Sequence, residues 1–364
     1  YRADGEMMKE DEAPIINSDA EFPDELFEGK NLKTKRQINI NEAANEKWKE
    51  RYLTTFPNLL TGLKICHYQH SAAGRDLIEQ ILTALGGEVF AFARSDEFIP
   101  IDTEAVSQLD KDQAIKWSNK YSFQLIISTD GDGDRPLLAD ENGNYFRGDT
   151  LGALAALYLK ADVIATPVSS TTAIEKSNLF TKVHRTKIGS PHVIAAMKDA
   201  SINPNLNVVG FEPNGGFLTA STIQSPMNGK PISPLPTRDA LLPILATIAL
   251  AKERGLLLSE LGTLLPNRTT ASDRLADTPK EISLSMISQF RENTSRAAIL
   301  SPQNVAPTKI DETDGLRMTF PNGDIVHLRP SGNAPELRFY AESTSEDAAA
   351  KLQNHVRAVL LKMC

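Results

Sequence analysis

The chain has 364 residues, of which 39 are Lys or Arg and 47 are Asp or Glu, so its net charge is −8. This acidic balance excludes a protein whose main task is to hold nucleic acid. No apolar run reaches the ~18 residues that a membrane span needs, and Cys66 and Cys364 supply neither a disulfide framework nor a zinc site. Length and composition predict a cytoplasmic, globular protein of roughly two to three domains, with no nucleic-acid or membrane partner.

Strand-like and helical segments alternate from about residue 56 onward. Short apolar runs predict strands at residues 63–68, 88–93 and 123–128. Apolar residues at helical spacing predict helices at residues 74–85 and 103–121. This alternation is typical of an α/β domain.

The alternation is predicted a second time in the next stretch of the chain. It comprises strands at residues 162–168, 183–187 and 207–211 and helices at residues 150–159, 192–198 and 240–252. Small polar residues separate a strand from a helix at residues 71–74 and again at residues 169–172. The repeated pattern indicates two copies of one domain.

A final unit follows a hinge predicted at residues 264–267. The Asn322-Gly323 turn predicts a hairpin of two strands, at residues 316–320 and 325–328. A strand at residues 337–341 and a helix at residues 346–363 are predicted to complete the unit.

An acidic loop directly after the third predicted strand carries the clearest chemical signal. Its sequence is Asp130-Gly131-Asp132-Gly133-Asp134-Arg135. Three carboxylates at alternate positions converge on one cation only where the backbone turns tightly, which the two glycines permit. Carboxylates suit hard cations such as Mg²⁺ or Ca²⁺, and the carboxyl end of a strand is where α/β sheets place ligands. The neighbouring arginine suits a phosphoryl group.

Two other interpretations of this loop stay open. An EF-hand would need glycine at its sixth position, where Arg135 stands, and a helix before it, where the pattern predicts a strand. A plain acidic turn without a ligand is the other interpretation.

Two further loops carry polar groups that suit a phosphosugar. Glu212 and Asn214 follow a predicted strand and could bind vicinal hydroxyls, although a glycine turn explains the same residues. The stretch 329–338 places a Ser-Gly-Asn turn between two arginines, which suits phosphate, although a hairpin connection with solvated arginines is the alternative. The three loops fall about one per predicted domain, as a single site at a domain junction would require.

These loops resemble the metal-binding, sugar-binding and phosphate-binding loops of the α-D-phosphohexomutases, in the order of that family. Residues 211–216 and 234–239 are most similar to its bacterial phosphomannomutase and phosphoglucomutase members. The resemblance implies an α/β fold of tandem related domains with mixed sheets packed by helices, plus a smaller C-terminal α+β domain. It implies a remnant of domain 1 at residues 1–51, domain 2 at 52–147, domain 3 at 148–268 and domain 4 at 269–364.

The resemblance also assigns roles to single residues. The residues that would hold Mg²⁺ are Asp130, Asp132 and Asp134, and the residue that would contact the transferred phosphoryl group is Arg135. A loop of domain 3 would approach the substrate through Lys187, Gly189 and His192, and sugar hydroxyls would be bound by Glu212 and Asn214. The non-reacting phosphate would be held by Arg329, Ser331, Gly332, Asn333 and Arg338.

The reaction implied by the resemblance is an isomerisation of a hexose 1-phosphate to a hexose 6-phosphate, with mannose phosphate as the expected substrate. A phosphoserine donates its phosphoryl group, the hexose 1,6-bisphosphate reorients, and the serine takes back the other phosphate. Metal and arginines would stabilise the charge of the transferring group, and the loops would fix its in-line geometry.

The sequence departs from the family's pattern at three points. No Ser-His-Asn run, which carries the family's phosphoserine, occurs in the chain, so we expect that loop upstream of Tyr1 and no turnover from these residues alone. Gly216 stands where some relatives have histidine, which leaves the general acid/base open between His192 and Lys187. Asn333 replaces a threonine that many relatives have.

Two functions of other classes remain as alternatives. One is a non-catalytic protein that binds phosphosugars or divalent ions, suggested by the absent serine loop. The other is a structural module that binds Ca²⁺ through the acidic loop. Preference among mannose, glucose and glucosamine phosphates rests on single hydroxyl contacts that the sequence pattern leaves open.

Overall fold

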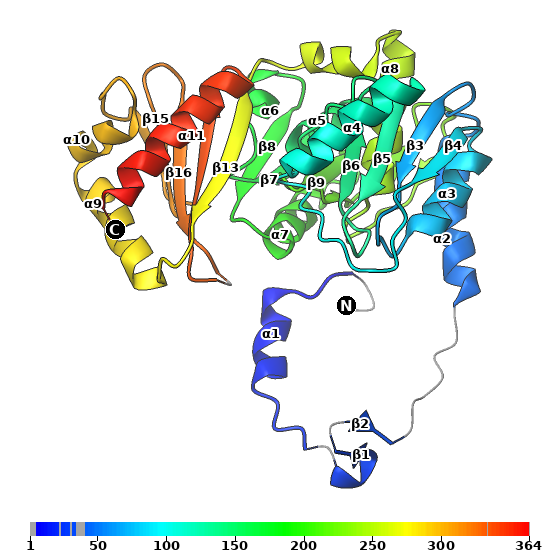
Figure 1. Cartoon of the computed structure of the whole chain (residues 1–364), viewed down its shortest axis with the longest axis horizontal. Coiled ribbons are helices and arrows are strands. Elements are labelled where there is room, and N and C mark those ends of the chain that lie inside the picture. The colour runs from blue at the N-terminus through cyan, green and yellow to red at the C-terminus, as the bar shows by residue number, and fades with distance from the viewer. Residues whose placement is uncertain (1–4, 22, 30, 34–40, 333, 364) are drawn as a thin grey trace.

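The computed structural model describes residues 5–21, 23–29, 31–33, 41–332 and 334–363 (Figure 1). The N-terminal segment forms an arm below the body of the molecule in that view. The elements of the arm are α1 (Lys9–Ile16), the 3₁₀ turn Asp24–Leu26, β1 (Phe27–Glu28) and β2 (Asn31–Leu32). The body consists of two mixed sheets with helices, a five-stranded antiparallel sheet and a two-stranded hairpin, which confirms the predicted α/β fold with a C-terminal α+β unit.

The first mixed sheet has the strand order β4-β3-β5-β6. Its strands are β3 (Lys64–Tyr68), β4 (Glu88–Phe92), β5 (Leu125–Thr129) and β6 (Pro136–Ala139), and only the last is antiparallel to its neighbour. The helices of this unit are α2 (Glu42–Thr55), α3 (Arg75–Ala84) and α4 (Gln108–Tyr121). The predicted helix start at residue 103 is wrong, because Ser107 is extended and caps α4 by accepting a hydrogen bond from the Asp110 N–H at 3.1 Å.

The second mixed sheet repeats this topology in the order β8-β7-β9-β10. Its strands are β7 (Val163–Pro167), β8 (Lys182–Thr186), β9 (Val208–Phe211) and β10 (Phe217–Thr219), and again only the last is antiparallel. Further elements of this unit are α5 (Gly148–Tyr158), α6 (Ala173–Lys176), α7 (Ser190–Ala200), α8 (Leu241–Arg254) and the hairpin β11 (Ile223–Gln224) and β12 (Pro231–Ile232). The expected duplication of one domain is therefore confirmed at the level of topology.

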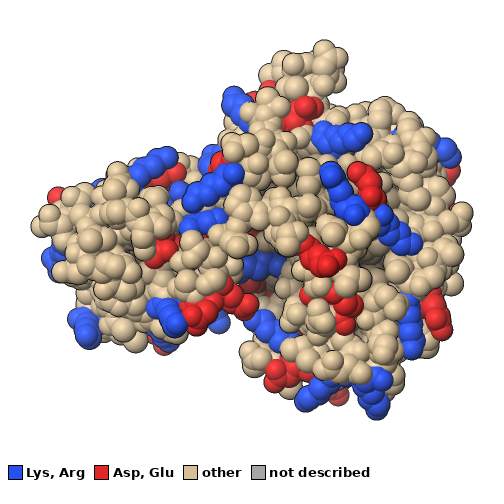
Figure 2. All heavy atoms as spheres, turned by 90° about the horizontal axis from the view of Figure 1, so that it is seen from above, with Lys and Arg blue, Asp and Glu red and all other residues tan. Residues whose placement is uncertain are grey.

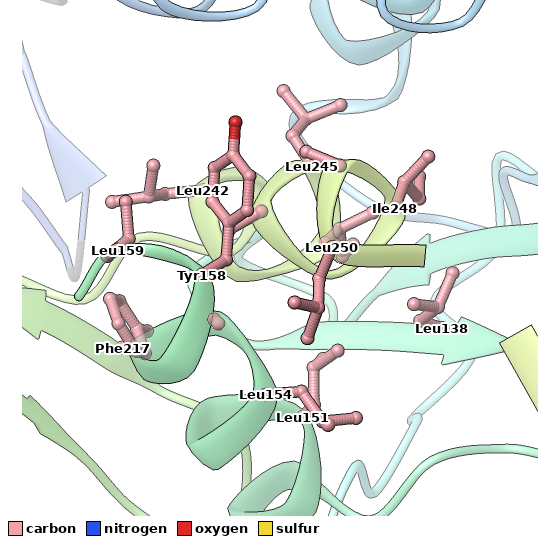
Figure 3. Packing of buried hydrophobic residues seen from close by; sticks show 14 of the residues in the cluster. Leu138, Leu151, Leu154, Tyr158, Leu159, Phe217, Leu242, Leu245, Ile248 and Leu250 are labelled. Carbon is pink, nitrogen blue, oxygen red and sulfur yellow. The ribbon is translucent and has the colours of Figure 1, made fainter. Parts of the chain in front are cut away.

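One apolar core joins the two mixed sheets. Side chains of α5 and α8 pack together with Leu138 of β6 and Phe217 of β10 (Figure 3). Every residue of α8 from Leu241 to Ala251 is buried, so this part of the helix is enclosed on all faces. Packing of this kind fixes the ends of β5 and β9 relative to each other.

The C-terminal unit is an antiparallel sheet in the order β13-β17-β16-β15-β14. Its strands are β13 (Thr269–Leu275), β14 (Lys309–Asp311), β15 (Leu316–Thr319), β16 (Ile325–Pro330) and β17 (Leu337–Ser343). Its helices are α9 (Lys280–Glu292), α10 (Thr294–Ala297), the 3₁₀ turn Ala298–Leu300 and α11 (Glu346–Leu361), and it follows the 3₁₀ helix Leu258–Leu264. It has its own apolar core. Among the described residues, no helix combines the length and apolar character of a membrane span.

A buried ion pair connects the C-terminal unit to the second mixed sheet. Nε of Arg268 lies 2.8 Å from Oε1 of Glu342, which also accepts a hydrogen bond from the Thr172 N–H at 3.0 Å. The Arg268 guanidinium additionally donates to the Gly323 carbonyl at 2.7 Å. Because each charge is hydrogen-bonded on both sides, this pair holds the two units in a defined orientation.

Candidate active site

The acidic loop lies between β5 and β6, at the carboxyl end of a fully buried strand. Its ends are joined by a hydrogen bond from the Asp130 N–H to the Arg135 carbonyl at 3.1 Å. Oδ1 of Asp130 accepts the backbone N–H groups of Gly133, Asp134 and Arg135 at 3.1–3.2 Å. Gly133 has a φ of +84°, a conformation that glycine adopts without strain. One buried carboxylate therefore organises the whole turn.

The three aspartates of this loop can hold one cation together. One carboxylate oxygen from each of Asp130, Asp132 and Asp134 lies within 4.8 Å of the others. The Asp134 carboxylate is buried and lies between two arginines, with Nη2 of Arg238 2.9 Å from Oδ2 and Nε of Arg135 3.8 Å from Oδ1. An all-carboxylate set that converges in this way fits a hard divalent ion such as Mg²⁺. The predicted metal ligands are thus brought together.

Burial has the largest effect on the pKa values of the carboxylates in this loop, and repulsion between them adds to it. Burial raises the pKa of Asp130 to about 6, and the charges of Asp134 and Asp132 push in the same direction. Burial also raises the pKa of Asp134, which the positive charge of Arg238 opposes. Nε of Arg135 lies 3.7 Å from Oδ2 of Asp130, so the predicted phosphoryl contact sits beside the metal ligands. A bound cation would relieve this repulsion.

The predicted sugar-binding loop, residues 212–216, is called the sugar loop below. It occupies the equivalent place between β9 and β10. Glu212 is buried, and its N–H donates to the Gly216 carbonyl at 3.1 Å. Oδ1 of Asn214 accepts the Gly216 N–H at 2.9 Å, which leaves the amide N–H₂ group of the side chain as its donor. Burial raises the pKa of Glu212, and the charges of Arg238 and Arg135 lower it. The arginine of the acidic loop therefore acts electrostatically on the acid of the sugar loop.

The acidic loop and the sugar loop are in contact. A Cβ on Gly215 would lie 2.8 Å from Cγ of Pro136, the residue that follows the acidic loop. The sugar loop is held from a third side by the Thr103 hydroxyl, which donates to the Asn214 carbonyl at 2.6 Å. The predicted metal ligands and the predicted hydroxyl-binding residues therefore lie at one edge of the molecule.

The domain 3 loop lies between β8 and α7. Gly189 precedes α7 with a φ of +123°, Lys187 is exposed, and His192 is half-buried in the first turn of the helix. The N–H of Ile188 donates to Oδ2 of Asp314, in the C-terminal unit, at 2.9 Å. This loop is therefore tied to the C-terminal unit.

The phosphate loop connects β16 to β17. Arg329 and Arg338 face each other in register on these strands, and the Ser331 N–H donates to the Glu336 carbonyl at 2.8 Å. Nε of Arg329 lies 2.9 Å from Oδ2 of Asp314, and Nε of Arg338 lies 3.5 Å from Oε2 of Glu336. Gly332 is exposed, whereas the prediction for Asn333 lies outside the described residues. In the structure, each of the two arginines is therefore paired with a carboxylate.

Three residues that link these loops were not among the predicted site residues. Asp314 joins the domain 3 loop to Arg329, as described above. Glu6 accepts hydrogen bonds from the Ser190 hydroxyl and from the backbone N–H of Arg238. Arg238 in turn lies against the acidic loop. Arg238 stood in a motif that carried the family resemblance, but Glu6 and Asp314 gave no local signal.

A hollow separates the C-terminal unit from the rest of the molecule, and acidic and basic side chains gather around it (Figure 2). A cavity of about 590 Å³ lies between α4 and α11 and is lined by Glu104, Lys111 and Arg147. Burial raises the pKa of Glu104, which the charge of Arg147 opposes. The segment before α4 therefore carries charged groups next to the sugar loop, which Thr103 contacts.

Comparison with known families matches two parts of the chain. Residues 147–268 match the alpha/beta/alpha domain III of phosphoglucomutase/phosphomannomutase. Residues 289–359 match the C-terminal domain of the same family. The first match contains the sugar loop, and the second contains the phosphate loop.

Two curated relatives extend the similarity over almost the whole chain. A phosphomannomutase of Salmonella muenchen is 46% identical over 356 residues, which cover 97% of this chain and 71% of that protein. A phosphomannomutase of Sinorhizobium fredii is 38% identical over 361 residues, which cover 99% of this chain and 75% of that protein.

Solved structures share the fold at lower identity. A phosphoglucomutase/phosphomannomutase family protein of Burkholderia thailandensis superposes with a TM-score of 0.67 at 18% identity, covering 88% of this chain and 64% of that one. An N-acetylphosphoglucosamine mutase of Aspergillus fumigatus, solved with GlcNAc-6P and magnesium, gives a TM-score of 0.57 at 16% identity. The match covers 89% of this chain and 67% of that one.

Proposed function

The chain belongs to the phosphoglucomutase/phosphomannomutase family of isomerases, and we propose that the protein interconverts the 1-phosphate and the 6-phosphate of a hexose. The observation that carries this proposal is the contact between the acidic loop and the sugar loop, through Pro136 and Gly215. It places groups for a divalent ion, a phosphoryl group and sugar hydroxyls at one edge. A pure ion-binding module would need no buried carboxylate such as Glu212 next to its metal loop.

Each loop has one task in this proposal. Asp130, Asp132 and Asp134 would hold Mg²⁺, which when bound supplies positive charge for the phosphoryl group in transfer. Arg135 adds a second positive charge beside it. Glu212 and Asn214 accept from and donate to sugar hydroxyls, which orients the hexose. The opposite phosphate is held by Arg329, Ser331, Gly332, Asn333 and Arg338.

The paired arginines imply an exchange of partners when substrate binds. Arg329 starts on Asp314 and Arg338 lies near Glu336. A phosphate carries more negative charge than a carboxylate and offers three oxygens, so it competes effectively for a guanidinium fork. Substrate binding therefore weakens the contact of Asp314 with Arg329.

Mannose phosphate is the proposed substrate, with hexose 1,6-bisphosphate as intermediate. The support comes from the names of the Salmonella and Sinorhizobium relatives. A further structure of the Aspergillus mutase contains glucose 1,6-bisphosphate, which supports a bisphosphate ligand for this fold. The domain boundaries, the cytoplasmic location and the choice between His192 and Lys187 as general acid/base stay predictions.

Binding to the 364-residue chain tests this function directly. We expect mannose 6-phosphate and mannose 1,6-bisphosphate to bind at least about tenfold more tightly than inorganic phosphate in calorimetry with Mg²⁺, because hydroxyl contacts add to phosphate contacts. Glucose 6-phosphate, which differs at one hydroxyl, reports the preference. Equal affinities for sugar phosphates and inorganic phosphate would contradict the proposal. Since the chain contains no Ser-His-Asn run, we predict no turnover from it in a coupled assay.

A further inference from the structure

Arg238 lies where three separate segments of the chain meet. Its Nη2 lies 2.9 Å from Oδ2 of Asp134 in the acidic loop, and its Nε lies 3.1 Å from Oε1 of Glu6 in the N-terminal segment. The backbone N–H of Arg238 donates to the same oxygen of Glu6 at 3.1 Å. The side chain is only 17% exposed. This guanidinium is therefore fixed from two sides.

Gly216 of the sugar loop gives Arg238 the space to reach Asp134. A Cβ at residue 216 would lie 2.7 Å from Cδ and 2.9 Å from Cγ of Arg238, closer than real Cβ contacts. The backbone of Gly216 is not in the left-handed region, so its conformation does not demand glycine. The close approach of Arg238 is thus the structural reason for glycine at this position.

We propose that Arg238 is a positioning residue that orients the Asp134 carboxylate for metal binding, and that Gly216 is the opening through which it passes. The inference rests on the proposed function, which assigns Mg²⁺ to the acidic loop. Outer partners that hold a metal-ligating carboxylate typically change metal affinity by about 10–100-fold when removed. The Arg238 side chain also packs on the sugar loop, so the geometry of the acidic loop depends on the sugar loop.

The positive charge of Arg238 also repels a cation, so the variants must separate charge from geometry. Arg238→Lys keeps the charge but loses the planar fork that reaches Glu6 and Asp134 together. Gly216→Ala leaves every charge unchanged and displaces the arginine stem. Any loss of Mg²⁺ affinity common to both variants therefore measures positioning.

Isothermal calorimetry of Mg²⁺ binding to the 364-residue chain is the experiment. We expect Arg238→Lys and Gly216→Ala each to weaken binding about tenfold. The matched controls are Gly262→Ala, whose Cβ would meet nothing within 4 Å, and Arg291→Lys, whose partner Glu312 is exposed; both should bind Mg²⁺ as the parent chain does. Parent-like binding by Arg238→Lys would overturn the proposal.

A double-mutant cycle tests the link between the two residues. Arg238→Ala removes Cγ and Cδ, so Gly216→Ala should cause no further loss of Mg²⁺ affinity in that background. Equal losses from Gly216→Ala in both backgrounds would show that the glycine acts without the arginine and would overturn the coupling. These readouts need no sugar, so they fail or succeed independently of the hexose phosphate binding that tests the proposed function.

Discussion

The β5–β6 and β9–β10 connections occupy the same place in two sheets of identical topology, yet they carry different chemistry. Each begins with a buried acid, Asp130 or Glu212, whose N–H donates to a carbonyl at the end of the loop at 3.1 Å. Each loop contains two glycines, but the first adds two more carboxylates whereas the second adds one amide. The strand order sets where a loop stands, and the loop residues set what it binds.

The difference lies in how each acid is used. Oδ1 of Asp130 accepts three backbone N–H groups, so this oxygen stabilises the turn and only Oδ2 is left for a ligand. The turn of the sugar loop is instead made by Asn214, which accepts the Gly216 N–H. The side chain of Glu212 is therefore not needed for its own turn, as the proposed role in binding a sugar hydroxyl requires.

The largest expected effect comes from neutralising the metal loop. Asp132→Asn should weaken Mg²⁺ binding by more than about 100-fold, because a direct ligand matters more than an outer partner. Its side chain is exposed, so the melting temperature without metal should stay the same. Calorimetry measures the first quantity and thermal denaturation the second; unchanged Mg²⁺ affinity would refute the metal assignment.

Two glycine variants compare the two turns themselves. Gly215→Ala combines a φ of +93° with a Cβ only 2.8 Å from Pro136, so we expect it to lower the free energy of unfolding by about 3 kcal/mol. Gly133→Ala has a φ of +84° and no atom closer than 3.7 Å, so we expect a loss of about 1 kcal/mol from backbone strain alone. Urea denaturation would measure both, and equal losses would contradict the packing of the two loops.

Removing the charge of Glu212 should weaken sugar phosphate binding and leave Mg²⁺ binding unchanged. Glu212→Gln should weaken mannose 6-phosphate binding about 30-fold, the equivalent of losing a hydrogen bond to a charged group worth about 2 kcal/mol. Mg²⁺ affinity should change less than twofold, which makes this variant the counterpart of Asp132→Asn. Calorimetry with each ligand in turn would show whether the two loops have separate tasks.

A buried histidine distinguishes the two sheets at low pH. His67 lies opposite Ile127 on β5, and the corresponding residue of the second sheet is Ile164, opposite Val209. Burial lowers the pKa of His67 to about 4, so the unfolded chain binds more protons below its ordinary value of 6.5. This contribution to stability is complete above pH 6.5 and is lost as the pH falls toward 4.

His67→Ile copies the residue of the second sheet and removes the titration. We expect the loss of unfolding free energy between pH 7 and pH 5 to be smaller in this variant by about 1.5 kcal/mol. Urea denaturation at the two pH values measures it. An identical pH dependence in the parent chain and the variant would show that His67 does not titrate as its burial requires.

Local patterns predicted the apolar strands and the three loops because these features depend on residues that are adjacent in the sequence. Buried parallel strands such as Leu125–Thr129 are continuous apolar runs, and the turns after them are marked by glycine. Several short or polar strands were not predicted, among them β6, which has four residues and starts with proline, and β13, which is mostly polar. Strand patterns of this kind depend on the neighbouring strand more than on their own composition.

The links between the loops could not be predicted in the same way. The contact between Glu6 and Arg238 spans 232 residues, and that between Ile188 and Asp314 spans 126. Asp314 precedes Gly315 and is indistinguishable from an ordinary turn residue in the sequence. Such contacts follow from the packing of whole units, which no window of adjacent residues contains.

The apolar core shared by α5 and α8 has a consequence for how the molecule denatures. Since each mixed sheet buries one face in the same core, loss of packing in one sheet removes contacts from the other. The C-terminal unit has a separate core. Heating should therefore give two calorimetric transitions rather than three, so the duplicated sheets form a single cooperative unit despite their origin as a pair.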